Sequence, residues 1–217
     1  MAKSRRRPPP FVVKLTEGPD LRDAVRAFLA GKRGSPRQEF ALGAFRHWME
    51  MEGSLARLQL ASKFLGRLRP RAANADAIGY HVEKHLEETY ILQQRVDRFL
   101  KLLERRLKKR RLTGEARQIS GIRLAFNKTM EGVLEPRHGH VHKERFRDLD
   151  IGQLQILDSF RKMGGTIDLQ KHREPLARET LQKWRGLLKT RHGQLSGIVD
   201  GVFQDLGSIG FEKLSPP

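Results

Sequence analysis

The sequence predicts an all-α protein, a single up-and-down helical bundle with extra helices at both ends. Apolar residues recur at steps of three and four through most of the 217 residues, which is the period of an amphipathic helix. No stretch of useful length alternates apolar and polar residues as a strand does, and no internal repeat is present. Proline and glycine interrupt the periodic segments, so we expect several helices joined by short turns.

The chain begins with a segment that is not typical of a packed helix. Residues 1–18 combine a cluster of arginines with three consecutive prolines, which disfavour both helix and sheet. We therefore expect a flexible basic, proline-rich arm, followed by one helical domain over 19–217. Pro19-Asp20 opens the first predicted helix, which reaches about Ala30.

Two long helices come next in the predicted bundle. The first covers 36–68, since Pro36 is acceptable in a first turn, and the second covers 76–111, with Asp76 as its N-cap. The apolar stripe of the second helix consists of Val82, Leu86, Tyr90, Val96, Leu100, Leu103 and Leu107. Its last turns are rich in lysine and arginine, which interact favourably with the negative end of the helix dipole even without a ligand.

Three further helices complete the predicted fold, over 115–134, 148–163 and 174–206. Pro136 disfavours the helical conformation at Glu135, so the first of them is expected to end there. Two consecutive glycines stop the second. The last and longest helix is expected to pack across the bundle or to extend a dimer interface.

The composition indicates a polyanion as partner. Lysine and arginine number 43 against 25 acidic residues, a formal charge of +18, and such a field attracts nucleic acid. A generally arginine-rich proteome would produce the same charge. The absence of cysteine excludes disulfides, thiolate nucleophiles and cysteine-based zinc sites. No apolar run approaches the length of a membrane span and the N-terminus lacks an export-signal core, so we expect a cytoplasmic protein without a membrane partner.

The segment Arg137-His138-Gly139-His140-Val141-His142 is the most informative stretch of the sequence. It places three of the eight histidines within five positions, directly behind an arginine. The planar guanidinium fork of arginine suits phosphate, and histidine can take or give a proton near neutral pH. The pattern therefore indicates phosphodiester chemistry, although imidazoles at alternating positions can also hold a metal ion.

The same residues resemble the signature of the HEPN superfamily, which is arginine, four to six residues, then histidine, often with a polar residue after the arginine. Arg137 and His142 have this spacing, and His138 occupies the polar position. The stretch His85-Leu86-Glu87 with Tyr90, and the run from Val141 to Phe146, also resemble patterns of uncharacterised prokaryotic HEPN-like proteins. The resemblance covers about residues 36–163.

The resemblance implies RNA as the ligand and a metal-independent endoribonuclease that needs no cofactor. In this interpretation Arg137 holds the phosphate, His142 transfers protons, and His138 positions the substrate or shares the proton transfer; His140 has no assigned role. The resemblance also implies a homodimer, an antitoxin protein as partner, and a defence or toxin–antitoxin system. Many HEPN-type domains are inactive binding modules, so catalysis and binding alone both remain open.

A metal site is the alternative at the same residues. His81 and His85 stand four residues apart on one helix and share a face, so they can act as a chelating pair. Together with His138, His140 or His142 they would complete a nitrogen-rich site for a transition metal in a non-catalytic helical interaction module. In the plainest interpretation Arg137 pairs with a nearby carboxylate and the histidines cap a helix. The sequence contains no phosphate-binding glycine loop, Ser/His/Asp order or paired-carboxylate motif, which disfavours a kinase, an esterase or a glycosidase.

Overall fold

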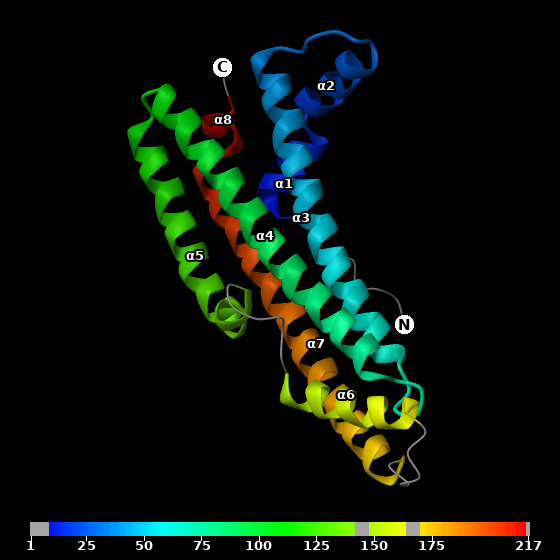
Figure 1. The fold of residues 1–217 in the computed structure, drawn as a ribbon. Coiled ribbons are helices and arrows are strands. Elements are labelled where there is room, and N and C mark those ends of the chain that lie inside the picture. Colours follow the sequence, from blue (N-terminus) through cyan, green and yellow to red (C-terminus); the bar gives the residue numbers. More distant parts are fainter. Residues whose placement is uncertain (1–8, 142–147, 164–169, 216–217) are drawn as a thin grey trace. The chain divides into compact units, whose positions relative to one another are not determined.

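The fold is all-α, as the sequence predicts (Figure 1). The computed structural model describes residues 9–141, 148–163 and 170–215, and it describes the side chains of all of these except 135–141. No strand occurs among these residues. The helices are α1 Pro10–Glu17, α2 Pro19–Leu29, α3 Pro36–Arg67, α4 Ala75–Lys109, α5 Thr113–Val141, α6 Leu149–Lys162, α7 Gln170–Ile209 and α8 Phe211–Leu214.

The chain divides into two compact units. Unit 1 comprises Met1–Gly53, Leu92–Met130 and Ser196–Pro217, and unit 2 comprises Ser54–Ile91 and Glu131–Leu195. The long helices α3, α4, α5 and α7 each contribute residues to both units. Within the described part of the chain, none of the helices has an apolar stretch of the length needed to cross a bilayer.

Unit 1 is organised around phenylalanine side chains. The ring of Phe11 is 1% exposed, and its centroid lies 6.5, 5.9 and 5.8 Å from those of Phe99, Phe203 and Phe211. Residues 10–17 form the helix α1, which places this ring in the core. The predicted flexible arm is therefore wrong for these residues. Pro10 occupies the first turn of α1, where a missing backbone N–H costs little. The arm residues 1–8 lie outside the described residues.

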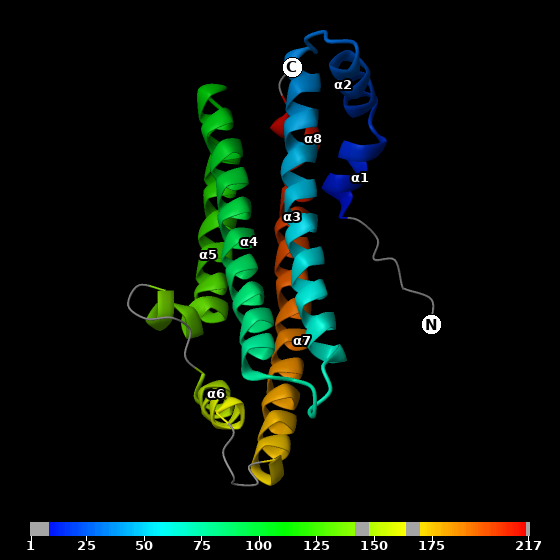
Figure 2. The ribbon, with the colours of Figure 1, turned by 45° about the vertical axis from the view of Figure 1, so that its right-hand side comes forward.

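A partly exposed ion pair helps to hold α2 against α3 in the same unit. The two helices lie side by side in Figures 1 and 2, and Arg37 Nε of α3 donates to Asp20 Oδ2 of α2 at 2.8 Å. Arg37 also contacts Glu212 Oε2 of α8 at 2.6 Å. These two carboxylates raise the pKa of Arg37, so its guanidinium keeps its positive charge.

Unit 2 has its own apolar core, to which α3, α4, α6 and α7 contribute. Its buried residues are Leu65, Ala73, Ala75, Ile78, Val82, Leu86, Ile151, Leu154, Ala177, Leu181, Trp184 and Leu188. The helix α6 crosses the N-terminal half of α7 in Figure 1. Lys183 of α7 holds the start of α6, since its ammonium contacts Asp148 at 3.0 Å and Asp150 at 2.6 Å.

Helix α5 continues beyond the predicted end at Glu135 and reaches Val141. The conformational bias that Pro136 places on the preceding residue is a preference, and here it is overridden. Arg137, His138 and His140 therefore belong to the last residues of a helix, and the prediction of a helix junction at Pro136 is wrong. Helix α7 is also longer than predicted, since it begins at Gln170 and ends at Ile209.

The N-cap of α4 is Asn74 and not the predicted Asp76. The side-chain Oδ1 of Asn74 accepts a hydrogen bond from the backbone N–H of Ala77 at 2.7 Å, while Asp76 stands in the first turn. Asn74→Ala should lower the free energy of unfolding by about 1 kcal/mol because one backbone donor at the helix start loses its partner. Chemical denaturation would measure this, with Asn74→Asp as the control that keeps the acceptor. An equal loss in both variants would contradict the capping role.

Candidate functional site

The predicted nuclease residues lie at the end of α5 and just after it. The backbone of Arg137, His138 and His140 is helical, but their side chains fall outside the described part of the chain, and so does the whole of His142. The proximity of these four side chains therefore stays a prediction. The preceding part of α5, Glu131–Leu134, is described and belongs to unit 2, where Leu134 is buried.

His81 and His85 of α4 have quite different surroundings. The ring of His81 is partly exposed and stacks on Phe64, with centroids 5.6 Å apart and planes 14° apart. His85 has no exposed surface, and neither of its ring nitrogens has a hydrogen-bond partner among the described residues. Burial lowers the pKa of both histidines, and the neutral rings that result are available as ligands or proton acceptors.

The described residues contain no group of three histidine or carboxylate side chains arranged to hold a metal ion. His81 and His85 alone thus do not make a metal centre. Glu87 and Glu88, the carboxylates that could have joined them, are engaged elsewhere: Glu87 contacts Lys84 at 2.7 Å and Glu88 contacts Arg57 at 2.8 Å. The larger predicted set, which adds His138, His140 and His142, extends beyond the described side chains and stays a prediction.

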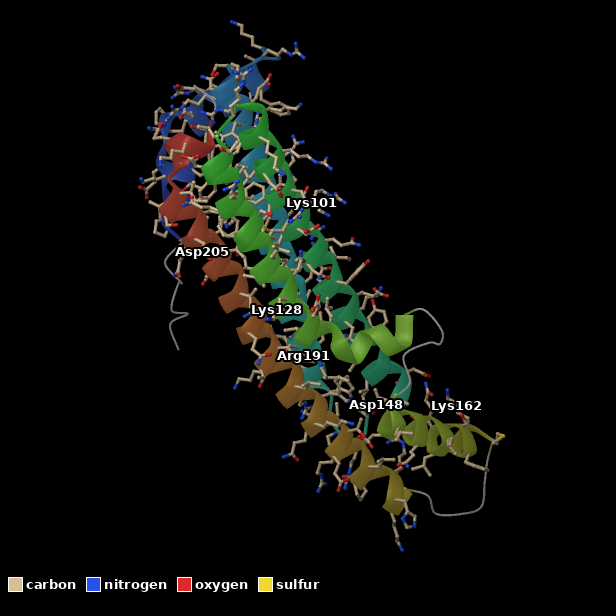
Figure 3. All side chains as sticks on the ribbon, turned by 90° about the vertical axis from the view of Figure 1, so that its left-hand side faces the viewer. Lys101, Lys128, Asp148, Lys162, Arg191 and Asp205 are labelled. Atoms are coloured by element: carbon tan, nitrogen blue, oxygen red, sulfur yellow. The ribbon has the colours of Figure 1, made fainter. Side chains whose placement is uncertain are left out.

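His85 belongs to a polar cluster with Arg191 and His192 of α7, both within unit 2. Burial is the largest cause that lowers the pKa of His85 to about 4, and the positive charges of Arg191 and His192 contribute to the same shift. Arg191, which Figure 3 labels on α7, has no carboxylate within ion-pair distance among the described residues, and burial lowers its pKa as well. We call these three residues the His85 cluster.

The chemistry of the His85 cluster favours an anion nearby. It combines a neutral imidazole with a permanent guanidinium cation and a second imidazole, while the nearest buried carboxylate on α4, Glu88, is held by both Nε and Nη2 of Arg57. The permanent positive charge of Arg191 in a low-dielectric setting stabilises negative charge. This electrostatic setting lies in the same unit as the last residues of α5.

Sequence analysis singled out His85 but missed Arg191 and His192. A local signal existed, because these two residues fall between Leu188 and Leu195 at positions where the apolar stripe of α7 would place a core residue. His85 and Thr89 interrupt the stripe of α4 in the same manner. Polar residues at positions where the helical period predicts buried apolar ones are therefore the sequence pattern that indicates this cluster.

The buried imidazole should make the protein sensitive to acid. The pKa of His85 in the folded protein, about 4, lies below the ordinary value of 6.5, so the unfolded chain takes up the proton first. The stabilising contribution is complete above pH 6.5 and is lost as the pH falls from 6.5 towards about 4, by about 3 kcal/mol in total. The electrostatic repulsion from Arg191 and His192 acts in the same direction as burial, because it also disfavours the protonated ring.

Denaturant titrations at several pH values would measure this dependence. His85→Met should remove most of the extra loss of stability in acid, because methionine fills a similar volume and does not titrate. The matched control is His81→Met, which should change the pH dependence less because His81 is partly exposed. An unchanged pH profile in the His85 variant would contradict the assignment.

A surface pocket of about 360 Å³ lies between α4 and α6 in unit 2, but it does not suit a phosphate. Its lining includes Gly79, Leu149 and Ile156, and its charged residues are Glu83 and Asp148. Among the described residues neither lysine nor arginine lines it, so the charges that do line it oppose an anionic ligand.

Comparisons with protein-family models, with curated proteins and with solved structures gave no match for this chain. The class that the fold defines is an all-α helical protein with a strongly basic sequence. Its function is therefore argued from its own residues.

Proposed function

We propose that this protein is an HEPN-like, RNA-directed helical protein that acts as a metal-independent endoribonuclease. The observation that carries the proposal is the spacing of Arg137 and His142 in the sequence of a chain of formal charge +18 whose described elements are all helices. The His85 cluster supports it, since it adds the partly buried cation of Arg191 to the unit that contains the last residues of α5.

The reaction requires proton transfer and charge stabilisation. The ribose 2′-oxygen attacks the adjacent phosphorus while His142 removes its proton, and the bond from phosphorus to the 5′-oxygen breaks as an acid protonates the leaving oxygen. Arg137 stabilises the negative charge of the phosphorane. The products are a 2′,3′-cyclic phosphate and a free 5′-hydroxyl. His138 positions the substrate or shares the proton transfer.

The proposal includes a homodimer, because one chain provides too few acid and base groups for the reaction. A second copy would bring its own Arg137 and His142 to a shared site and supply the missing acid. The proposal places the protein in the cytoplasm, where its RNA ligand is, and in a defence or toxin–antitoxin system with an antitoxin protein as partner.

The proposal is tested by incubating the purified protein with single-stranded RNA in the presence of EDTA. We expect cleavage that EDTA does not suppress, with 2′,3′-cyclic phosphate at the new ends. Strict dependence on an added divalent ion, or 3′-hydroxyl ends, would contradict the mechanism. No cleavage of varied RNAs would remove the catalytic part of the proposal.

A further inference from the structure

Helix α4 carries a row of exposed cations along the part that belongs to unit 1. Its members are Arg98, Lys101, Arg105, Lys108 and Lys109, which we call the basic stripe. At 3.6 residues per turn these positions fall on one face of the helix, and they extend over about 16 Å along its axis. Figure 3 shows Lys101 projecting from the edge of α4, away from α5.

Stabilisation of the fold does not account for the whole basic stripe. Cations oppose the negative end of the helix dipole only within the last turn, so this effect covers Lys108 and Lys109 but not Arg98 or Arg105. Two neighbouring cations of the same segment do have structural contacts. Arg106 lies over the ring of Phe40, 4.9 Å from its centroid, and Arg110 donates to two backbone carbonyls, those of Lys213 and Ser215. Arg106 and Arg110 point to other faces than the stripe.

The α4 and α5 segment of unit 1 has too few acidic residues to neutralise the positive charge of the stripe. Residues 92–130 contain twelve lysines and arginines against three acidic residues, Asp97, Glu104 and Glu115. All three carboxylates are already paired: Asp97 with Lys101 at 2.7 Å, Glu104 with Lys108 at 2.6 Å, and Glu115 with Lys213 at 3.6 Å. Arg98, Arg105 and Lys109 have no ion-pair partner among the described residues.

An apolar side chain accompanies the charges. Leu102 lies on the same face of α4 and is 43% exposed, although the helix buries Leu100, Leu103 and Leu107 on its other side. An exposed leucine among cations can contact the face of a ribose or an unpaired base while its neighbours hold the phosphates. A narrow row of this length suits one strand of a nucleic acid.

We propose that the basic stripe binds the phosphate backbone of a single RNA strand, as a binding surface separate from the cleavage residues Arg137 and His142. The choice of RNA rests on the proposed function, whereas the presence of an anion-binding row rests on the geometry of α4. The stripe supplies affinity without sequence preference, because phosphate contacts carry no base information.

The test removes the three unpaired cations together, in the variant Arg98→Gln, Arg105→Gln and Lys109→Gln. Glutamine keeps the helix propensity and loses the charge. Binding of a fluorescent single-stranded oligouridine, followed by anisotropy over a range of salt concentrations, should weaken at least about tenfold at physiological salt. The slope of log affinity against log salt should become shallower by about 2, since each single-strand phosphate contact contributes about 0.7.

The matched control removes three exposed cations that lie on three different helices, Arg22→Gln, Arg67→Gln and Lys189→Gln. None of these three has an ion pair among the described residues, and the total loss of charge is the same. The proposal requires the control to keep most of the affinity and the original salt slope. Equal losses in the two triple variants would overturn it, because total charge alone would then determine binding. Circular dichroism checks that both variants retain their helices.

Two further results distinguish this proposal from binding to an acidic lipid surface and from the nuclease proposal. Binding of the wild-type protein to phosphatidylserine vesicles but not to oligouridine would overturn the RNA assignment in favour of an acidic lipid surface. Arg137→Ala removes one phosphate contact and should make the salt slope of RNA binding shallower by no more than about 0.7, whereas the triple variant of the stripe should change it by about 2. If the protein does not cleave RNA but its RNA binding still depends on the stripe, the nuclease proposal is wrong and the binding proposal stands. If the protein cleaves RNA normally but its RNA binding does not depend on the stripe, the binding proposal is wrong and the nuclease proposal stands.

Discussion

Arg137→Ala and His142→Ala should each reduce RNA cleavage by a factor of about a hundred to ten thousand. In the proposed mechanism, loss of His142 removes the group that transfers protons in the transition state, and loss of Arg137 removes the positive charge that stabilises the phosphorane. Both effects act on the reaction step, whereas RNA affinity depends mainly on the remaining basic surface. Cleavage rates under single-turnover conditions, together with RNA affinity, would separate the two effects.

The neighbouring histidines provide the controls for this experiment. His140→Ala should change the cleavage rate much less than His142→Ala, because the HEPN pattern does not specify position 140. His138→Ala should have an intermediate effect if this residue positions the substrate. Circular dichroism and the oligomeric state should be unchanged in all of these variants. Normal cleavage by both Arg137→Ala and His142→Ala would show that the catalytic assignment is wrong.

Arg173→Met should lower the free energy of unfolding by about 3–5 kcal/mol, the largest effect on stability that we expect. The guanidinium of Arg173 is almost completely buried; its Nε donates to Asp158 Oδ1 at 2.6 Å and its Nη2 donates to the carbonyl oxygen of Ala73 at 2.5 Å. Asp158 Oδ2 in turn accepts the backbone N–H of Ala75 at 2.9 Å. This network joins α6, α7 and the start of α4 within unit 2.

The large cost arises because the single substitution leaves the carboxylate of Asp158 largely buried without a counter-charge. Adding Asp158→Asn to Arg173→Met should therefore recover a substantial part of the lost stability, since the asparagine oxygen can still accept the N–H of Ala75. Denaturant unfolding of both single variants and the double variant gives the coupling energy between the two positions. Additive losses would contradict a direct charge pair.

The surroundings of His81 and His85 in unit 2 could not be predicted from the sequence. His85 was predicted as a member of a metal-binding pair with His81, because the spacing of four residues places both on one face. In the structure His81 stacks on Phe64 near the surface, while His85 is completely buried beside Arg191 and His192, more than a hundred residues away in the sequence. Helical spacing determines which residues share a face, but it carries no information about what that face meets.

The sequence by itself determined the all-α class and the approximate positions of the long helices, because periodicity, caps and breaks are local properties. The segment 148–163 illustrates this: α6 covers Leu149–Lys162, and Asp148 caps it by accepting the N–H of Ile151 at 3.1 Å. Only the tertiary structure decided that Phe11 belongs to a core and that Arg173 meets Asp158 and Ala73. These outcomes depend on contacts between distant segments, where burial and charge pairing outweigh the local preferences of proline and arginine.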